Sequence, residues 1–577
     1  MMSKIKTLLV GINSKQVHAS LSIRYLREAV GNNIEIMEYT INQPVNVILS
    51  DILEHEFDVI GFSCYIWNME LIEKLSHMVK LVKKDVSIVL GGPEVSFYIP
   101  TLLDRMPWVD FVISGEGEES FPLLLEDIYF KRVPTHESIY SKDKREGSYG
   151  VVHNFNLVKF PYKEEDFTVE KIVYYEFSRG CPFNCSYCLS STFRGVRCRD
   201  IELAKKELSY LIEKKVKLVK FVDRTFNAHI HSLELLRFLK EHGDETLFHF
   251  EICADLLNEE WIDFLSTTPK ECFQFEIGVQ TTNAETMKEI SRVTHLEKLY
   301  KNVKLLKNMG NMHLHLDLIV GLPFEGIESF KKSFNDIFAL YPSALQIGFL
   351  KVLKGSEIEQ KSYEYEIVYT PYAPYEVLQT KWLTYKEVAE LKWFEEAVER
   401  YYNSEKFSHS ILEYVKCFSS AYTAFVHLSI KLKLLLGLDK NVAFQELIKL
   451  LHGCYFEIEV SHEARENFEK LLYLDYLCLG REKGKLEFFE YLSQQEKSKV
   501  TEFYGYDLSK VYEAYPHYQG QKKEQLQKSL TIYYFSSLKL NESNVHSTPL
   551  FIVIDYGSKK KTESANYKIL VESSLKV

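Results

Sequence analysis

Short apolar runs separated by amphipathic stretches fill the first 130 residues of the chain. Five runs contain few polar residues: "IKTLLVGI" (5–12), "IEIMEY" (34–39), "FDVIGFS" (57–63), "VSIVLGG" (86–92) and "VDFVISG" (109–115). Strands that are buried on both faces of a parallel sheet have this composition. Segments such as "NMELIEKLSHMVKLVKK" (68–84) lie between them and have helical spacing. The pattern predicts a doubly wound α/β domain whose ligand lies beyond the carboxyl ends of the strands.

A second alternation of strands and helices begins near residue 172. Its six strands are expected at "IVYYEFSRG" (172–180), "VKLVKFVD" (216–223), "LFHFEIC" (247–253), "FQFEIGVQ" (273–280), "MHLHLDLIVGLP" (312–323) and "ALQIGFLKVL" (344–353). Six such units predict a partial (β/α) barrel, in which chemistry gathers at the carboxyl ends of the strands. From about residue 380 the pattern is mainly helical, with a few strands near the end.

These patterns divide the α/β chain into successive parts. We expect a doubly wound domain over residues 1–135, a polar linker over 136–170, a partial (β/α)6 barrel over 171–360 and a mainly helical domain over 361–577. A chain of this length is too long for one ordinary domain.

Composition narrows the class of protein. A hydrophobic content of 46% with 26% charged residues is typical of soluble globular domains. The first apolar run is too short for a signal peptide, and no run is long enough to span a membrane, so we expect a cytoplasmic protein. The formal net charge of −11 argues against a general nucleic-acid binder.

Three cysteines lie within eight residues, in the segment "SRGCPFNCSYCLSSTFRG" (178–195). They are Cys181, Cys185 and Cys188, in the spacing C-x3-C-x2-C. Three thiolates can hold three irons of a [4Fe–4S] cube and leave the fourth iron open, whereas a closed cluster needs four cysteines. Structural zinc also takes four protein ligands, usually as two separated pairs. Cys198 is the alternative fourth ligand, but we expect it in a region that has already become helical.

This spacing after the first barrel strand, with Tyr187 before the last cysteine, resembles the radical S-adenosylmethionine enzymes. The resemblance implies a [4Fe–4S] cluster whose open iron binds S-adenosylmethionine, and cleavage of that cofactor to a 5′-deoxyadenosyl radical. It places Asp223 and Asn227, in "FVDRTFNA", near the methionyl end of the cofactor. It also pairs Arg292, in "ISRVTH", with the cofactor's carboxylate. The alternative for Arg292 is a charge on a surface helix.

Two strands of the barrel carry further candidates by the same resemblance. Glu276 and Gln280 lie on the fourth strand, where alternation aims both toward one face. Asp317, in "LDLIVGLP", resembles the fifth-strand signature and is a candidate for the ribose or for catalysis on the substrate. Ordinary polar packing inside the barrel is the alternative for Glu276 and Asp317.

The first domain has its own candidate site. Gly91 and Gly92 end a strand where a bulky ligand can lie against bare backbone. The segment "GEGEES" (115–120) lacks the third glycine of a dinucleotide fingerprint. Together the segments resemble the cobalamin-binding domain fused ahead of many radical S-adenosylmethionine enzymes, which implies that Ser63, Gly91 and Gly92 contact cobalamin. The family's Asp-x-His-x-x-Gly signature is absent and only His18 remains, so we expect cobalt without a histidine ligand. A domain of this fold that has lost its ligand is the alternative.

The segments after the barrel resemble a branch of these enzymes with a C-terminal domain of unknown function. Tyr372, Tyr375 and Glu376 can line a substrate mouth, although packing of an aromatic loop on the barrel is the alternative. The resemblance implies a cobalamin-dependent methyltransferase that modifies carbon in a small molecule or peptide, with a reductase or flavodoxin as electron donor. The alternatives are a cobalamin-linked rearrangement, cyclisation or reduction, and a non-catalytic sensor.

Overall fold

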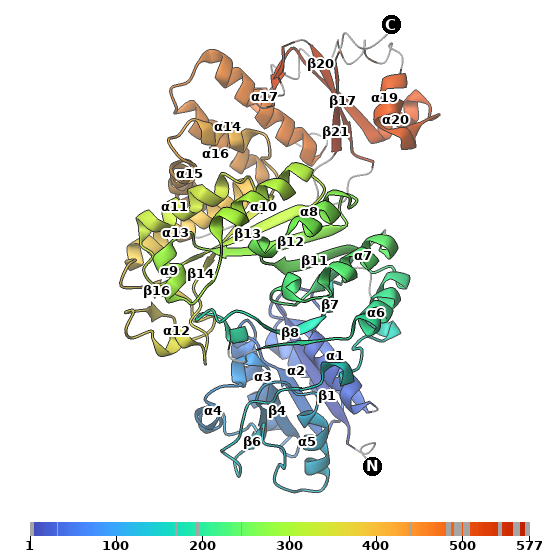
Figure 1. Ribbon diagram of the computed structural model, residues 1–577, viewed down its shortest axis with the longest axis vertical. Coiled ribbons are helices and arrows are strands. Elements are labelled where there is room, and N and C mark those ends of the chain that lie inside the picture. Colours follow the sequence, from blue (N-terminus) through green and yellow to red (C-terminus); the bar gives the residue numbers. More distant parts are fainter. Residues whose placement is uncertain are drawn as a thin grey trace. The chain divides into compact units, whose positions relative to one another are not determined.

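The computed structural model describes residues 5–31, 33–167, 171–191, 195–243, 245–437, 441–480, 486–489, 499, 503, 508–540, 545–547, 549–557 and 566–571. The chain forms two compact units (Figure 1). The first comprises Met1–Ser333, Leu340–Ser343 and Ile347–Val388, and the second comprises Phe334–Ala339, Ala344–Gln346 and Ala389–Val577.

The first sheet has the strand order β2-β1-β3-β4-β5-β6. Its strands are β1 (Thr7–Asn13), β2 (Ile34–Thr40), β3 (Val59–Ser63), β4 (Ser87–Gly91), β5 (Phe111–Ile113) and β6 (Ile139–Ser141). The pairs among the first five are parallel, and β6 pairs antiparallel with β5. The strand order reverses at β1, so a crevice is expected at the carboxyl ends of β1 and β3. Strand β6 lies within the range that the sequence predicted as a linker.

Helices cover both faces of this sheet. They are α1 (Leu21–Val30), α2 (Val45–Leu53), α3 (Met69–Val82), α4 (Ile99–Arg105) and α5 (Ser120–Tyr129). Side chains alternate across β1, so Leu8 packs in the core shared with α2, α3 and α4, whereas Leu9 packs in the core shared with α1 and α5. All of β1 is buried, which explains its unbroken apolar pattern.

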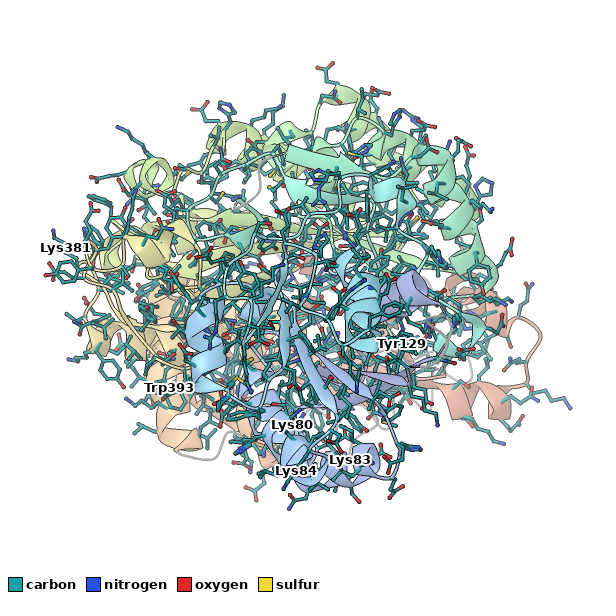
Figure 2. The ribbon with its side chains drawn as sticks, turned by 90° about the horizontal axis from the view of Figure 1, so that it is seen from below. Lys80, Lys83, Lys84, Tyr129, Lys381 and Trp393 are labelled. Carbon is teal, nitrogen blue, oxygen red and sulfur yellow. The ribbon has the colours of Figure 1, made fainter. Side chains whose placement is uncertain are left out.

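Three lysines lie close together at the end of α3 (Figure 2). Lys80 pairs with Asp110 at 2.8 Å, and Lys83 pairs with Glu56 at 2.9 Å. Two of the three positive charges are therefore balanced within the domain, and the third is on Lys84.

The second sheet has the order β14-β13-β12-β11-β10-β7, which does not close into a full barrel. Its strands are β7 (Val173–Tyr175), β10 (Leu218–Phe221), β11 (Leu247–Ile252), β12 (Phe273–Gln280), β13 (His313–Val320) and β14 (Ala344–Phe349). The alternating helices are α6 (Ile201–Glu213), α7 (Ser232–His242), α8 (Glu259–Ser266), α9 (Ala284–Glu289), α10 (Leu296–Met309) and α11 (Ile327–Phe338). The pairs from β7 to β13 are parallel, so the carboxyl ends of these strands share one edge.

A small hairpin interrupts the first barrel unit. Strands β8 (Ser178–Cys181) and β9 (Gly195–Cys198) pair antiparallel and form a sheet of their own. Cys198 is therefore the last residue of a strand, and our expectation that it lies in a helical region was wrong. Helix α6 begins at Ile201, where the Asp200 side chain accepts hydrogen bonds from two backbone N–H groups of the first turn.

After the barrel the chain forms α12 (Glu357–Gln360) and a two-stranded sheet of β15 (Val368–Tyr369) and β16 (Val377–Gln379). The second unit contains α14 (Ser410–Lys416), α15 (Ala421–Leu436), α16 (Phe444–Phe456), α17 (His462–Leu479), α19 (Ser509–Ala514) and α20 (Lys523–Ser529), preceded by α13 (Tyr385–Val398). An antiparallel sheet of β17 (Leu530–Phe535), β20 (Leu550–Asp555) and β21 (Asn566–Val571) follows, beside the pair β18 (Leu538–Lys539) and β19 (Val545–His546).

The predicted fold class is confirmed: a doubly wound domain, a partial barrel and a mainly helical C-terminal region. The predicted domain limits stay predictions. Among the described helices, none combines the length and the apolar character that crossing a membrane requires.

Candidate functional site

The three clustered cysteines follow the first barrel strand on one short loop. Cys181 is the last residue of β8, and its thiol lies 3.5 Å from the hydroxyl of Thr225. Cys185 is buried, and its carbonyl accepts a hydrogen bond from the backbone N–H of Cys188. Among the described residues, none of the three forms a disulfide. One loop therefore supplies three sulfurs, which fits a cluster held by three cysteines.

Arg292 lies against this loop. Its guanidinium donates to the carbonyl of Gly278 at the end of β12, to the hydroxyl of Tyr187 at 3.3 Å and to the sulfur of Cys185 at 3.8 Å. Burial alone lowers the pKa of Arg292, but Tyr187 and Cys185 outweigh it and the pKa is raised. The guanidinium therefore stays charged beside the cysteines. Its Nε is buried and has no hydrogen-bond partner among the described residues, so one donor is left for a ligand.

The end of β12 is irregular where it faces Arg292. The pairing of β12 with β13 shifts between Gly278 and Gln280, and Gln280 has a positive φ of 72°. A Cβ atom on Gly278 would lie 2.3 Å from the Gln280 amide nitrogen. The Gln280 side chain thus folds over the bare backbone of Gly278 at this irregularity.

Glu276 is paired inside the barrel. Its carboxylate accepts from the Lys220 ammonium at 3.2 Å and lies 3.0 Å from Nε2 of His249. Burial raises the pKa of Glu276, but the His249 hydrogen bond and the Lys220 charge outweigh it and lower the pKa to about 2. Glu276 is therefore ionised and already holds two protein partners.

Asp317 lies one strand further along. The pairing of β12 with β13 places Glu276 opposite His315 and Gly278 opposite Asp317. Burial, and then the charges of Glu276 and Glu251, raise the pKa of Asp317 well above its usual range. Its Oδ1 lies 3.3 Å from Nε2 of His315, and neither atom has a hydrogen-bond partner among the described residues. This part of the barrel interior is therefore polar, and some of its hydrogen-bonding groups have no hydrogen bond among the described residues.

The remaining two barrel candidates bind the protein's own backbone. The buried Asp223 carboxylate accepts from the Phe177 N–H at 3.0 Å and from the Ser178 hydroxyl at 2.5 Å. Burial raises the pKa of Asp223 to about 7. The Asn227 amide exchanges two hydrogen bonds with the backbone of Cys253, at 2.8 and 2.9 Å. Both side chains therefore position the strand ends around the cysteine loop, and contact with a cofactor stays a prediction.

The first domain has polar and aromatic groups at its expected crevice. Ser63 ends β3 beside Gly91 of β4, and its hydroxyl lies 2.8 Å from that of Ser22. The rings of Tyr65 and Trp67 stack with centroids 4.4 Å apart, and Trp67 is 45% exposed. The indole N–H of Trp67 donates to the carbonyl of Ile12 at the end of β1. The Trp67 ring is thereby held at the carboxyl ends of β1 and β3, where the strand order reverses and a flat ligand can lie.

The two adjacent glycines of this crevice differ. A Cβ atom on Gly91 would meet no atom closer than the Cβ of Ile113, at 4.0 Å. Gly92 has φ 112° and ψ 172°, and a Cβ atom there would lie 2.5 Å from the carbonyl oxygen of Cys64. Only Gly91 therefore borders open space, and Gly92 is glycine because its own backbone requires it.

His18 contacts the barrel. Its Nδ1 lies 2.5 Å from the hydroxyl of Tyr174 in β7, and its backbone bridges to Ile172. Burial and then nearby Lys15 lower the pKa of His18. One ring nitrogen is thus already engaged by the protein.

The aromatic loop after the barrel packs on the first domain. The hydroxyl of Tyr375 and the ammonium of Lys354 both donate to Glu94, the latter at 2.6 Å. Tyr375 is buried, whereas Tyr372 is 68% exposed. Tyr375 is thus held by the first domain, whereas our alternative expectation was packing on the barrel, and a role at a substrate mouth stays a prediction.

Several residues around the site escaped sequence reasoning. Lys220 and His249 alternate with apolar residues on their strands, and that inward position was the available signal. Trp67 and Glu94 follow strands β3 and β4, but nothing local marked them.

Three family models match successive parts of the chain. They are described as "B12 binding domain" over residues 7–125, "Radical SAM superfamily" over residues 175–337 and "Protein of unknown function (DUF4080)" over residues 363–554. The matched ranges follow the order of the doubly wound domain, the barrel and the C-terminal region.

Characterised relatives are about a quarter identical to this chain over the aligned residues. The 2-(S-pantetheinyl)-carbapenam-3-carboxylate methyltransferase of Streptantibioticus cattleyicolor is 24% identical over 314 residues, covering 48% of this chain and 44% of the relative. The cobalamin-dependent radical SAM methyltransferase TokK of Streptomyces tokunonensis is 24% identical over 326 residues, covering 51% and 46%. The chain thus matches about half the length of these relatives. The solved structure of OxsB, a cobalamin-dependent S-adenosylmethionine radical enzyme with aqua-cobalamin bound, has a TM-score of 0.54 at 14% identity, covering 82% of this chain and 84% of OxsB.

Proposed function

The chain belongs to the radical S-adenosylmethionine enzymes that carry a B12-binding domain before the barrel and the DUF4080 domain after it, and we propose that it is a cobalamin-dependent methyltransferase. One observation carries the proposal: three thiols on one loop, with the charged Arg292 against them, at the edge of a polar barrel interior. The two named methyltransferase relatives support the reaction class.

The three cysteines would hold three irons of a [4Fe–4S] cluster. When bound, the cluster and S-adenosylmethionine supply a 5′-deoxyadenosyl radical, and cobalamin supplies a methyl group. Arg292 would orient the cofactor's carboxylate through its remaining donor. Gly278 has no Cβ atom, and the Gln280 amide occupies that position beside Arg292.

The barrel interior favours a polar substrate. Lys220, His249, Glu276, His315 and Asp317 occupy it where bulky branched side chains usually fill a barrel. A substrate with hydrogen-bonding groups can bond to Oδ1 of Asp317 and Nε2 of His315, which have no hydrogen bond among the described residues, whereas an apolar substrate leaves both buried without one. We therefore expect a small polar molecule or a peptide as substrate, and a flavodoxin-type donor in the cytoplasm. The net charge of −11 disfavours nucleic acid.

The test is anaerobic product analysis with S-adenosylmethionine labelled in its methyl group. Protein reconstituted with iron, sulfide and cobalamin should release 5′-deoxyadenosine after reduction and should pass label to cobalamin. The Cys185→Ala variant should do neither, while the matched Cys198→Ala variant should behave as the wild type.

Two results would count against the proposal. Release of 5′-deoxyadenosine without any transfer of label would favour rearrangement, cyclisation or reduction instead. A protein that binds cluster and cobalamin but never cleaves S-adenosylmethionine would favour a sensor.

A further inference from the structure

Two arginines face each other across the hairpin that carries the first cysteine. Arg179 lies in β8, two residues before Cys181. It stands directly opposite Arg197 of β9 in the strand pairing. Like charges directly opposite each other destabilise a strand pair, and a two-stranded hairpin alone is marginally stable. The hairpin therefore requires an external source of negative charge.

The first domain supplies that negative charge from the segment "GEGEES" (115–120), which lacks the third glycine of a dinucleotide-binding motif. Glu116 accepts two parallel hydrogen bonds from the Arg197 guanidinium, at 2.6 and 2.8 Å. It also accepts from the Val152 N–H at 2.8 Å and lies 3.4 Å from the Arg179 guanidinium. Glu118 accepts from Arg179 at 2.6 Å. Both glutamates follow β5 and lie at the carboxyl edge of the first sheet. Figure 1 shows β8 where this sheet meets the barrel.

The contacts are shielded and pre-positioned. The Arg179 and Glu118 side chains are each 10% exposed, and the Arg179 guanidinium lies 5.2 Å from the ring centre of Tyr25 and 4.7 Å from that of Phe155. Glu116 is fixed by its own backbone, because its N–H donates to Gly150 at 2.9 Å. The bidentate Arg197–Glu116 pair is more open, with side chains 23% and 19% exposed, but its two parallel hydrogen bonds make it geometrically specific. Loss of Glu118 leaves the more enclosed Arg179 charge without one of its carboxylates.

We propose that Glu116 and Glu118 are positioning residues that hold the Arg179–Arg197 hairpin, and with it Cys181, against the first domain. We call these four residues the Glu–Arg clamp. Glu176, which lies between β7 and β8, also accepts from Arg179 at 2.8 Å, so Arg179 keeps a local partner when Glu118 is lost. Arg197 has no second carboxylate among the described residues. The proposal therefore predicts that loss of Glu116 destabilises the hairpin more than loss of Glu118.

The first test needs no cofactor. Amide hydrogen exchange of residues 178–181 and 195–198 should be about ten- to a hundredfold faster in Glu116→Gln, and less affected in Glu118→Gln, because a charge-assisted hydrogen bond is lost. Glu119→Gln is the matched control, since Glu119 is in the same segment and exposed. Exchange in strands β1 and β12 reports whether the fold is intact. Hairpin exchange at the wild-type rate in Glu116→Gln would overturn the clamp.

A double substitution separates the clamp from simple loss of packing. Glu116→Gln/Arg197→Gln removes the carboxylate together with one of the two opposed positive charges. Its hairpin should exchange more slowly than that of Glu116→Gln alone, because Arg179 then faces no like charge. Additive acceleration in the double variant would contradict the proposal.

The consequence for the cluster rests on the proposed function. After reconstitution, Glu116→Gln should lose its cluster to a chelator about tenfold faster than the wild type or Glu119→Gln, and the reduced cluster should give an altered electron paramagnetic resonance spectrum. If the wild type assembles no cluster, the proposed function fails while hydrogen exchange still decides the clamp. If the wild type assembles one and Glu116→Gln holds it equally well, the clamp does not position Cys181.

Discussion

Substitutions at the two adjacent glycines of the first domain should have opposite consequences. Gly92 has φ 112° and ψ 172°, a region that is essentially restricted to glycine and costs other residues about 1–3 kcal/mol. In Gly92→Ala the new Cβ atom would also lie 2.5 Å from the carbonyl oxygen of Cys64, so backbone has to move. We expect Gly92→Ala to lose about 3 kcal/mol of folding free energy or more.

Gly91→Ala should be nearly neutral for folding. Its Cβ atom would meet nothing closer than 4.0 Å and the residue is at the end of a strand, so the change should stay within about 0.5 kcal/mol. Gly91→Leu, by contrast, projects a larger side chain into the open space next to Ile113 of β5. It should abolish cobalamin binding while the domain remains folded.

Thermal unfolding followed by circular dichroism measures the first effect, and corrin absorbance retained after desalting measures the second. Gly91→Ala is the matched control for both, because it adds a Cβ atom one residue away. The reasoning fails if Gly92→Ala unfolds at the same temperature as Gly91→Ala. It also fails if Gly91→Leu retains one cobalamin per chain.

Three further predictions concern the barrel. Replacing Cys181, Cys185 and Cys188 by alanine should abolish the iron and sulfide bound after reconstitution, whereas Cys198→Ala should keep about four of each per chain, as counted by chemical analysis. Arg292→Ala and Glu276→Ala should weaken S-adenosylmethionine binding about ten- to a hundredfold by calorimetry, through loss of a charge-assisted bond; unchanged affinity in both would leave them with packing roles. Glu325 is buried after β13, where its carboxyl accepts from the hydroxyls of Thr281 at 2.6 Å and Ser333 at 3.1 Å. Burial raises the pKa of Glu325 to about 7, above its unfolded value near 4.5, so the folded state holds the extra proton and the free energy of unfolding falls as pH rises between these values. Urea unfolding from pH 4 to 8 should show this loss, at most about 3 kcal/mol, and it should be absent in Glu325→Gln.

The strands of both sheets could be predicted because burial on two faces leaves a local trace. Strand β1 is buried along its whole length, and β12 alternates buried and half-buried residues. The β8–β9 hairpin left no such trace. Its strands are four residues each, and its stabilising carboxylates are supplied from 61 and 81 residues earlier in the chain.

The cysteines could be predicted because three thiols at this spacing are sufficient to ligate three irons of one cluster. The sequence also indicates which polar residues stand at the strand ends near the cysteines, but it does not indicate which groups they bond to. Asp223 stands at the end of a strand as expected, yet its carboxylate binds backbone and a serine. Gly91 and Gly92 are indistinguishable in sequence, and only the path of the backbone shows that one borders space and the other does not.

The hydrogen bonds of Glu94 bear on the order in which parts of the protein fold during synthesis. Its two donors, Lys354 and Tyr375, lie 260 and 281 residues later in the chain. Domains tend to fold as they leave the ribosome, so the first sheet is complete long before either donor has been synthesised. The first sheet can therefore fold before the loop after the barrel is present, and the hydrogen bonds to Glu94 join the two only once that later segment has been made.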